Sequence, residues 1–399
     1  MTLATRLDRL RGCSHDVAAV PLSDSLKKLR PIDRAQSRQT DIEVLAQALS
    51  VEQVSEGVLL RTRNYQLPAS SSLGSLCDLP EVCDLDAADW VYLDTETTGL
   101  SGGIGNLAFM IGLARLCEGT RLQVRQYLLG SFSAEADMLR AVAAWVGPEA
   151  VLVSYNGKGF DVPLLDARVR LQRIGFAFAA RRHLDLMYNV RRAYRKHWPD
   201  CRLQTAERRA LDLHRVGDQP GAEAPLAWQA WLRQGNTDRL YGTLQHNFQD
   251  VVSLALLHRY LPGVYDGRQR IGCDLAAIGR AWQGVGRAER AQRVWEGAAE
   301  RLEERGTLEL AALHRRRGEW ERAAALWSRL QSCGSALAAL ELSKYHEHRT
   351  RDYARALSFA SRCAPTERHV RLERLQAKLA SDPQLSLLQV NAESAKAMK

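Results

Sequence analysis

The segment Val91-Tyr-Leu-Asp-Thr-Glu-Thr-Thr-Gly-Leu100 decides the fold of this chain, because a short apolar run ends in two acidic residues. Side chains on a strand alternate between its faces, so Asp94 and Glu96 project from the same face at the C-terminal end. Two carboxylates held this close repel each other unless a cation lies between them. Oxygen ligands of this kind favour Mg²⁺ or Mn²⁺. A solvated acidic strand end is the alternative, which the following Thr-Thr-Gly disfavours.

The surrounding sequence predicts an α/β fold. Residues 107–116 and 121–130 are apolar, β-prone runs that predict two more strands. A helix is expected over 134–146, a strand over 150–157 and a second helix over 162–173. Strands that give way to alternating strand and helix are typical of a domain with a mixed sheet. Residues 183–215 and 224–261 are expected to be mainly helical.

Two further acidic residues stand in settings that are comparably marked. Asp161 lies between the strand ending in Ser154 and the next helix, where capping of that helix is the alternative role. His246 and Asp250 are four residues apart in an amphipathic stretch, so they share one face of the expected helix. An exposed His–Asp pair on that helix is the alternative there.

Three motifs now stand in a fixed order: D-T-E-T-T-G-L (94–100), N-G-K-G-F-D-V-P-L-L (156–165) and H-N-x-x-D-V-x-S-L (246–254). Together they resemble the motifs of the DEDD exonucleases, DnaQ-like enzymes with a ribonuclease H-like fold. The resemblance covers residues 88 to 262. The segments Cys201–Glu207 and Asp218–Gly221 resemble the bacterial YprB-type subfamily, in which tetratricopeptide repeats follow the nuclease domain.

The resemblance implies that Asp94, Glu96, Asp161 and Asp250 bind two divalent metal ions, Mg²⁺ or Mn²⁺. Two such ions stabilise the attacking and leaving oxygens during displacement at phosphorus. His246 is then the candidate general base, since an imidazole accepts a proton near neutral pH. Its position departs from the family pattern, because histidine-type enzymes usually place this residue five positions before the last Asp. Tyrosine-type enzymes place a Tyr at the spacing found here.

A further set of polar residues is predicted to contact the substrate. Four follow the first acidic pair, and the glycine among them allows close approach of a nucleic-acid backbone. They are Thr97, Thr98, Gly99 and Leu100. Asn156 is expected to bind a phosphate or sugar. Asp185 either resembles an acidic position of this fold or caps a helix.

The chain has 399 residues and a formal net charge of +9. Residues 168–215 contain thirteen Lys and Arg against four Asp and Glu, so the excess is concentrated there. Arg191 and Arg192, with Trp198 nearby, are predicted to bind phosphates and stack on a base. A solvated helical face is the alternative. Nucleic acid is therefore the expected partner, with DNA favoured over RNA.

The C-terminal part repeats itself at intervals of 32 and 33 residues. Residues 286–291 (GRAERA) recur as 318–323 (GEWERA) and 351–356 (RDYARA), each before an apolar helical stretch. This period is typical of tetratricopeptide-like helical hairpins, and an irregular helical bundle is the alternative. Such arrays more often bind proteins, and the resemblance implies a repair helicase as partner.

We therefore expect an N-terminal extension (1–87), a nuclease domain (88–262), helical repeats (266–380) and a tail (381–399). No apolar stretch is long enough to span a membrane. The eight cysteines are too sparse for a disulfide scaffold, which favours the bacterial cytoplasm. The expected activity is metal-dependent 3′-to-5′ hydrolysis of DNA in repair. An exoribonuclease of RNA processing and a non-catalytic nucleic-acid-binding scaffold are the alternatives.

Overall fold

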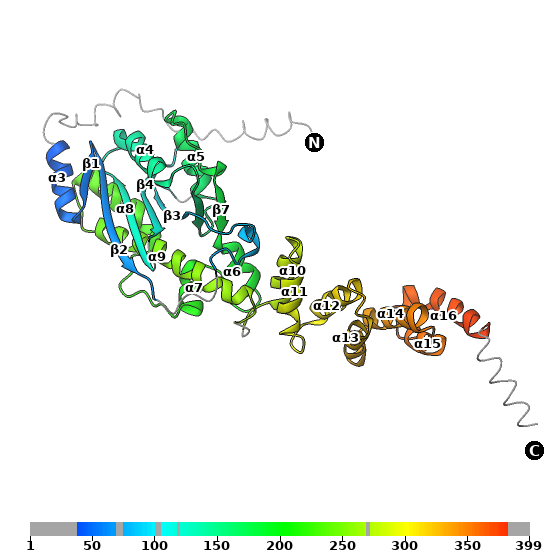
Figure 1. Ribbon diagram of the computed structural model, residues 1–399. Coiled ribbons are helices and arrows are strands. Elements are labelled where there is room, and N and C mark those ends of the chain that lie inside the picture. The colour runs from blue at the N-terminus through cyan, green and yellow to red at the C-terminus, as the bar shows by residue number, and fades with distance from the viewer. Residues whose placement is uncertain (1–37, 69–74, 100–104, 118–119, 269–271, 382–399) are drawn as a thin grey trace, which may run out of the picture. The chain divides into compact units, whose positions relative to one another are not determined.

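The computed structural model describes residues 38–68, 75–99, 105–117, 120–268 and 272–381 (Figure 1). Of residues 1–44 it describes only the start of helix α3 (Arg38–Leu49). Residues 45–399 begin with a seven-stranded sheet. Its strands are β1 (Glu52–Ser55), β2 (Val58–Gln66), β3 (Trp90–Thr97), β4 (Ala108–Leu116), β5 (Arg121–Leu129), β6 (Val151–Ser154) and β7 (Arg182–Asp185).

The sheet is mixed, with the strand order β1-β2-β5-β4-β3-β6-β7. The pairs β1–β2, β2–β5, β5–β4 and β4–β3 are antiparallel. The pairs β3–β6 and β6–β7 are parallel. The α/β fold with a mixed sheet is thereby confirmed. Strands β1 and β2 come from the segment expected to be an N-terminal extension, and they complete one edge of this sheet.

The strands expected at 107–116 and 121–130 are β4 and β5. In the sheet, β4 pairs with β3, and β5 pairs with β4. Residues 183–215 hold one element that was not expected, the four-residue strand β7, which is too short to show a pattern. The helices of this part are α4 (Glu135–Val146), α5 (Asp161–Leu171), α6 (Leu186–Tyr194), α7 (Leu203–Ala210), α8 (Ala224–Gln234) and α9 (Leu240–Tyr265).

Helix α9 positions the site, because it packs against the three central strands β3, β4 and β5. Its second half, from Val251 to Arg259, is buried on every side. Helix α8 packs on β4 through Trp228, whose ring stacks on that of Phe109 with 5.2 Å between centroids. Apolar burial of this extent makes the sheet and α9 one rigid support.

The rest of the described chain is all helical, as expected. Its helices are α10 (Leu275–Gly284), α11 (Ala288–Glu296), α12 (Glu304–Arg316), α13 (Trp320–Ser332), α14 (Ala336–Tyr345), α15 (Tyr353–Ala360) and α16 (Pro365–Ala380). A π-helical turn (His346–Thr350) extends α14. None of the described helices is long and apolar enough to cross a membrane.

The repeated motif falls at the turn inside each helical pair α10–α11, α12–α13 and α14–α15. The first residue of each copy is left-handed, with φ of 77° at Gly286, 79° at Gly318 and 57° at Arg351. Glycine adopts this conformation without steric cost. The third copy has Arg351 in place of glycine and still makes the left-handed turn. The last residue of each copy, Ala291, Ala323 or Ala356, is fully buried. That the pairs are tetratricopeptide repeats stays a prediction.

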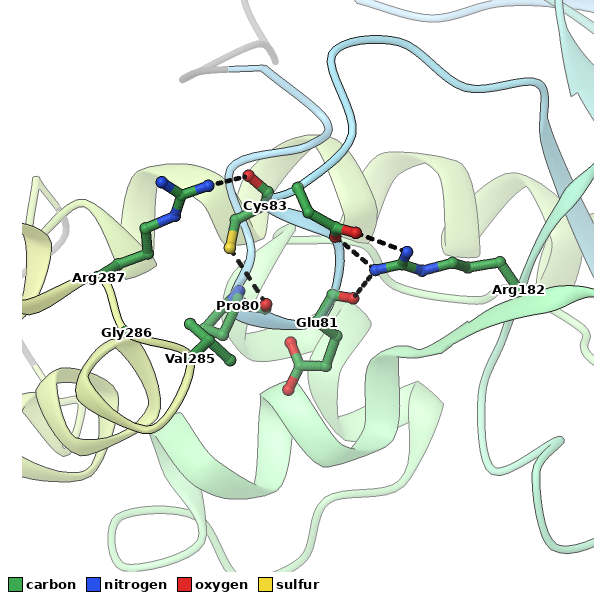
Figure 2. A pocket seen from close by; sticks show the side chains of 8 residues that line it. Pro80, Glu81, Cys83, Arg182, Val285, Gly286 and Arg287 are labelled. Carbon is green, nitrogen blue, oxygen red and sulfur yellow. Dashed lines mark hydrogen bonds and ion pairs between the residues drawn. The ribbon is translucent and has the colours of Figure 1, made fainter.

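Residues 75–86 contact both the part of the chain that contains the sheet and helix α11. Asp78 pairs with Arg290 at 2.7 Å, and the Cys83 carbonyl accepts a hydrogen bond from Arg287. Figure 2 shows the adjoining cavity, which has a volume of about 340 Å³ and is lined by residues 80, 81, 83, 84, 182 and 285–287. Arg182 is already paired there with Asp84. None of the predicted catalytic residues lines this cavity, so the search for the site moves to the end of β3.

Candidate active site

Strand β3 carries the first acidic pair at the point where its burial ends. Residues 90–93 are buried, and Asp94 and Glu96 follow on one face. Glu96 is only 8% exposed, although it is a carboxylate. Asp94 lies directly across from Gly112 of the neighbouring strand β4. The apolar run thus delivers two acidic side chains to the edge of the core, as the sequence predicts.

Asn247 of α9 fixes the position of Asp94. Its amide nitrogen donates to Asp94 Oδ2 at 2.9 Å, and its amide oxygen accepts from Gln126 Nε2 at 2.9 Å. The absence of a side chain at Gly112 makes this possible, because a Cβ there would lie 2.2 Å from the Asn247 oxygen. Both Asn247 and Gln126 are buried, so this bond network orients Asp94 rigidly.

Asp161 is the first residue of α5, and the residue before it occupies the cap position. Thr95, which alternates with the acidic pair on β3, donates its hydroxyl to Asp161 Oδ1. The loop before α5 turns back sharply at Asn156, whose φ is +68°. Gly157 fits the turn because a Cβ there would clash with Ser154. The loop therefore places Asp161 beside the end of β3.

Asp185 holds this loop in place. Its carboxylate accepts from the backbone N–H of Asn156 at 2.7 Å and of Lys158 at 3.1 Å. It also accepts from Met187 N as the N-cap of α6. The capping role, one of the two predicted for Asp185, is confirmed. The residue is 2% exposed and supports the site from behind.

Asp250 and His246 lie on the same face of α9, with 3.5 Å between His246 Nε2 and Asp250 Oδ2. The pair is not an exposed one, since the two side chains are only 12% and 14% exposed. Arg215, from the loop between α7 and α8, forms an ion pair with Asp250. The same loop provides Asp218, whose Oδ1 is 2.8 Å from His246 Nδ1.

Burial raises the pKa values of the four carboxylates, and repulsion within the group raises those of Asp94 and Glu96 further. The pKa of Asp94 lies well above its usual range because of burial, then because of the charges of Asp250, Glu96 and Asp161. Burial and the charges of Asp250 and Asp161 act on the pKa of Glu96 in the same direction. Burial raises the pKa of Asp161 to about 6, against the hydrogen bond from Thr95. These interactions show that the four carboxylates form one electrostatic group.

The pKa of Asp250 is raised less than those of Asp94 and Glu96. Burial raises it, whereas the charges of His246 and Arg215 lower it. Arg215 is therefore the protein's own partial compensation for the negative charge of the group. Of the four carboxylates, the Arg215 guanidinium contacts Asp250 only, so Asp94, Glu96 and Asp161 have no ion pair among the contacts recorded for the described residues.

The chemistry of the donor set fits a hard divalent cation, because all four groups are carboxylates and their charge is only partly compensated. In the conformation described, no three His, Cys, Asp or Glu side chains of the described residues stand in a ready-made metal-binding arrangement. One oxygen of Asp250 is held by Arg215 instead.

The predicted substrate residues after β3 are partly committed to local bonds. Thr97 donates its hydroxyl to the Gly99 carbonyl, and the Thr98 hydroxyl accepts from Leu107 N. Leu100 lies outside the described residues. Asn156 uses its backbone N–H for Asp185, as described above. Their role in binding substrate stays a prediction.

The two predicted phosphate-binding arginines differ from each other. The Arg192 guanidinium binds Glu81 at 2.8 Å and the Tyr265 hydroxyl at 2.9 Å. These bonds already engage Arg192, whose side chain is 27% exposed, and its role in binding phosphates stays a prediction. Arg191 is exposed on α6, and its role in binding phosphates stays a prediction. Trp198 is stacked on Tyr194, with 3.9 Å between ring centroids.

Sequence reasoning assigned no role to several residues of this site. Asn247 stood inside the third motif, between His246 and Asp250, and Thr95 stood between the two acidic residues of the first. The resemblance of residues 201–207 and 218–221 to a subfamily was a signal for Glu207 and Asp218, although it named no function for them. Arg215 had no signal, because a single arginine in a basic segment is indistinguishable from its neighbours.

The fold and the carboxylate group define a ribonuclease H-like domain, and residues 91–262 match the family model of the RNase H superfamily. That superfamily indicates a phosphodiester hydrolase with a nucleic-acid substrate. A curated relative, the uncharacterized protein YprB of Bacillus subtilis (strain 168), is 29% identical over 363 residues, 82% of this chain and 87% of the relative. The chain is therefore similar to YprB and contains a ribonuclease H-like domain, so the expected resemblance is confirmed.

A solved structure, the family B DNA polymerase of the archaeon Pyrobaculum calidifontis, aligns with 71% of this chain at 13% identity. The TM-score is 0.38, and the chain spans 36% of the polymerase's length. A similarity at this level does not establish a shared fold.

Proposed function

We propose that this protein is a divalent-metal-dependent exonuclease that releases nucleotides from the 3′ end of DNA during repair. The observation that carries the proposal is the group of four buried carboxylates from β3, α5 and α9, whose pKa values are raised together. A protein keeps such a costly group when a ligand of opposite charge stabilises it. The RNase H-superfamily domain supports phosphodiester hydrolysis as the reaction.

In the proposal, Asp94, Glu96, Asp161 and Asp250 hold two Mg²⁺ or Mn²⁺ ions, which supply positive charge to the attacking and leaving oxygens at phosphorus. Asn247 keeps Asp94 oriented, and Thr95 does the same for Asp161. The rigidity of these bonds matters, because small displacements of positioned groups cost large factors in rate.

His246 is the general base of the proposal. Its Nε2 lies 3.5 Å from Asp250 Oδ2, so a water held beside Asp250 would be within reach of the imidazole, which would take its proton. In the proposal, Gly99 contacts the terminal nucleotide, and Asn156 binds a phosphate or sugar. Arg191 adds positive charge on α6 for the phosphates that follow.

The choice of DNA and of a repair role rests on the resemblance of residues 201–207 and 218–221 to the YprB-type subfamily. The helical region, with its three pairs of similar helices, is the proposed binding surface for a repair helicase. An exoribonuclease with the same carboxylates is the alternative that the experiment separates.

The test is nucleotide release from DNA and from RNA of the same sequence, each labelled at one end, with Mg²⁺, Mn²⁺ or EDTA. Stepwise shortening of DNA that requires the metal and is absent in Asp94→Ala is the expected result, and the labelled end gives the polarity. Asp137→Ala is the matched control, because Asp137 is exposed on α4 and pairs only with Arg140. A preference for RNA would replace the repair role. Equal activity of Asp94→Ala and the wild type would refute the proposal.

A further inference from the structure

The loop between α7 and α8 brings two charged residues into the site. Arg215 is the first, and its guanidinium side chain is only 9% exposed. Its Nε and Nη2 donate to the two carboxylate oxygens of Glu207 at 2.7 and 2.6 Å, which is a bidentate ion pair. Glu207 belongs to α7 and is 1% exposed, so Arg215 is anchored to a buried carboxylate.

Asp218 is the second residue, and it joins Arg215 to the imidazole of His246. One oxygen of Asp218 accepts from Arg215 Nη1 at 3.1 Å, and the other lies 2.8 Å from His246 Nδ1. A carboxylate oxygen and an unprotonated ring nitrogen would repel each other at that distance, so Nδ1 carries the proton and donates it. The Arg215 nitrogen 3.3 Å from the same Nδ1 is a donor too and is satisfied by Asp218.

The opposite nitrogen of the ring is left free to accept a proton. With Nδ1 donating to Asp218, Nε2 is the ring nitrogen that faces the carboxylate group, and it lies 3.5 Å from Asp250 Oδ2. Gly221 stands beside it, and a Cβ at that position would approach Nε2 to 3.1 Å. The glycine therefore keeps the accepting side of the imidazole open.

We propose that Asp218 is a positioning residue for His246, which fixes the ring so that Nε2 faces the carboxylate group, and that Arg215 and Glu207 hold Asp218 in place. This inference rests on the proposed function, in which His246 is the general base. It gives a role to both segments that the subfamily resemblance singled out, since Glu207 ends the first and Asp218 and Gly221 bound the second. The arrangement follows the Asp–His logic of hydrolases whose base is oriented by a carboxylate.

The experiment compares Asp218→Asn with the wild type in two measurements on the full-length protein. The first is the ¹⁵N–¹H correlation spectrum of the histidine rings, with the signal of His246 identified from its loss in His246→Gln. We expect the Nδ1-protonated tautomer in the wild type and its loss in Asp218→Asn. The second is nucleotide release with Mg²⁺, where kcat should fall about 100-fold or more while KM stays within about threefold.

Asp212→Asn is the matched control, because Asp212 is an exposed acidic residue of the same loop. It should leave the tautomer and kcat unchanged. If Asp218→Asn does not fold, Gly221→Ala tests the same geometry, since its methyl group crowds Nε2 without removing a charge. That variant should lower kcat by about tenfold or more at unchanged KM.

The outcomes separate this inference from the proposed function. If the wild type hydrolyses DNA and both Asp218→Asn and Gly221→Ala retain its kcat, the positioning role is wrong and the exonuclease remains. A wild-type tautomer with Nε2 protonated would also overturn the positioning role. If the wild type, Asp94→Ala and Asp218→Asn are all inactive on DNA and RNA with either metal, the proposed function fails and this inference fails with it.

Discussion

Two buried groups of charge, one at the end of β3 and one in the C-terminal helices, are built in opposite ways. In the first, burial and repulsion raise the pKa of all four carboxylates. In the second, Glu347 is 2% exposed and accepts from Arg371, Arg374 and Lys378, each at 2.8 Å. Burial alone would raise the pKa of Glu347, but the bonds from Lys378 and Arg374 lower it to about 2.

The difference indicates which group is complete in the folded chain. Glu347 has three cationic partners for its single negative charge, and these ion pairs connect the turn after α14 with helix α16. The carboxylates of β3, α5 and α9 have Arg215 as their one recorded guanidinium partner among the described residues. Removing one partner of a buried ion pair destabilises the fold, whereas a buried charge without partners indicates a ligand site. The predictions below test this distinction.

The largest effect is expected for Asp94→Asn, which removes one charge from the under-compensated group. Hydrolysis should fall more than about a thousandfold, because an amide is a weak metal ligand and the group has lost its central charge. The unfolding temperature should not fall, since repulsion from Asp250, Glu96 and Asp161 is relieved. Nucleotide release and thermal unfolding measure the two. A variant that is both active and less stable would contradict the distinction.

The next effect is expected for Glu347→Gln, which removes the centre of the compensated group. Three cationic side chains then lie together without their anion, and the free energy of unfolding should fall by about 3 kcal/mol. Nucleotide release per folded molecule should be unchanged. Glu373→Gln on α16 is the control, because its side chain is 65% exposed. Denaturant unfolding measures both variants, and a loss equal to that of the control would show that the ion pairs contribute nothing.

The sequence predicted the parts of this molecule that depend on local pattern. The apolar runs of β3, β4 and β5 had to be buried, and the acidic residues followed from where those runs end. The repeated turn was visible because two of its copies begin with a glycine, Gly286 or Gly318, the residue that favours a left-handed conformation. Strand β7 was missed because four residues carry no period, and its place in the sheet depends on pairing with β6.

The network around the carboxylates was outside the reach of sequence reasoning for a different reason. Asn247 acts on Asp94 across 153 residues, and it can do so only because Gly112 of a third element leaves room for its amide. Arg215 reaches Glu207 and Asp250 from a loop whose path is set by tertiary contacts. Contacts of this kind depend on packing in three dimensions, which no single residue pattern contains.

Acid should affect the compensated group in a defined pH window. The pKa of Glu347 is about 2 in the fold and near 4.5 when unfolded, so its ionised form is stabilised by folding. Its contribution is fully present above pH 4.5 and is lost as the pH falls towards 2, by about 3 kcal/mol in all. The difference in unfolding free energy between the wild type and Glu347→Gln should therefore narrow across this window. A difference that stays constant with pH would show that hydrogen bonding geometry, and not ionisation, stabilises the turn.

The smallest effect is that of the metal itself on stability, and it should distinguish the two groups most directly. A cation that binds only the folded state stabilises it by about 2.7 kcal/mol at a hundredfold excess over its Kd. Mg²⁺ or Mn²⁺ should therefore raise the unfolding temperature of the wild type, and EDTA should reverse the rise. Glu347→Gln should show the same rise from its lower starting point, because this substitution leaves the carboxylates of β3, α5 and α9 unchanged. Asp94→Asn should show little or none, and an undiminished rise in that variant would place the binding site of the cation elsewhere.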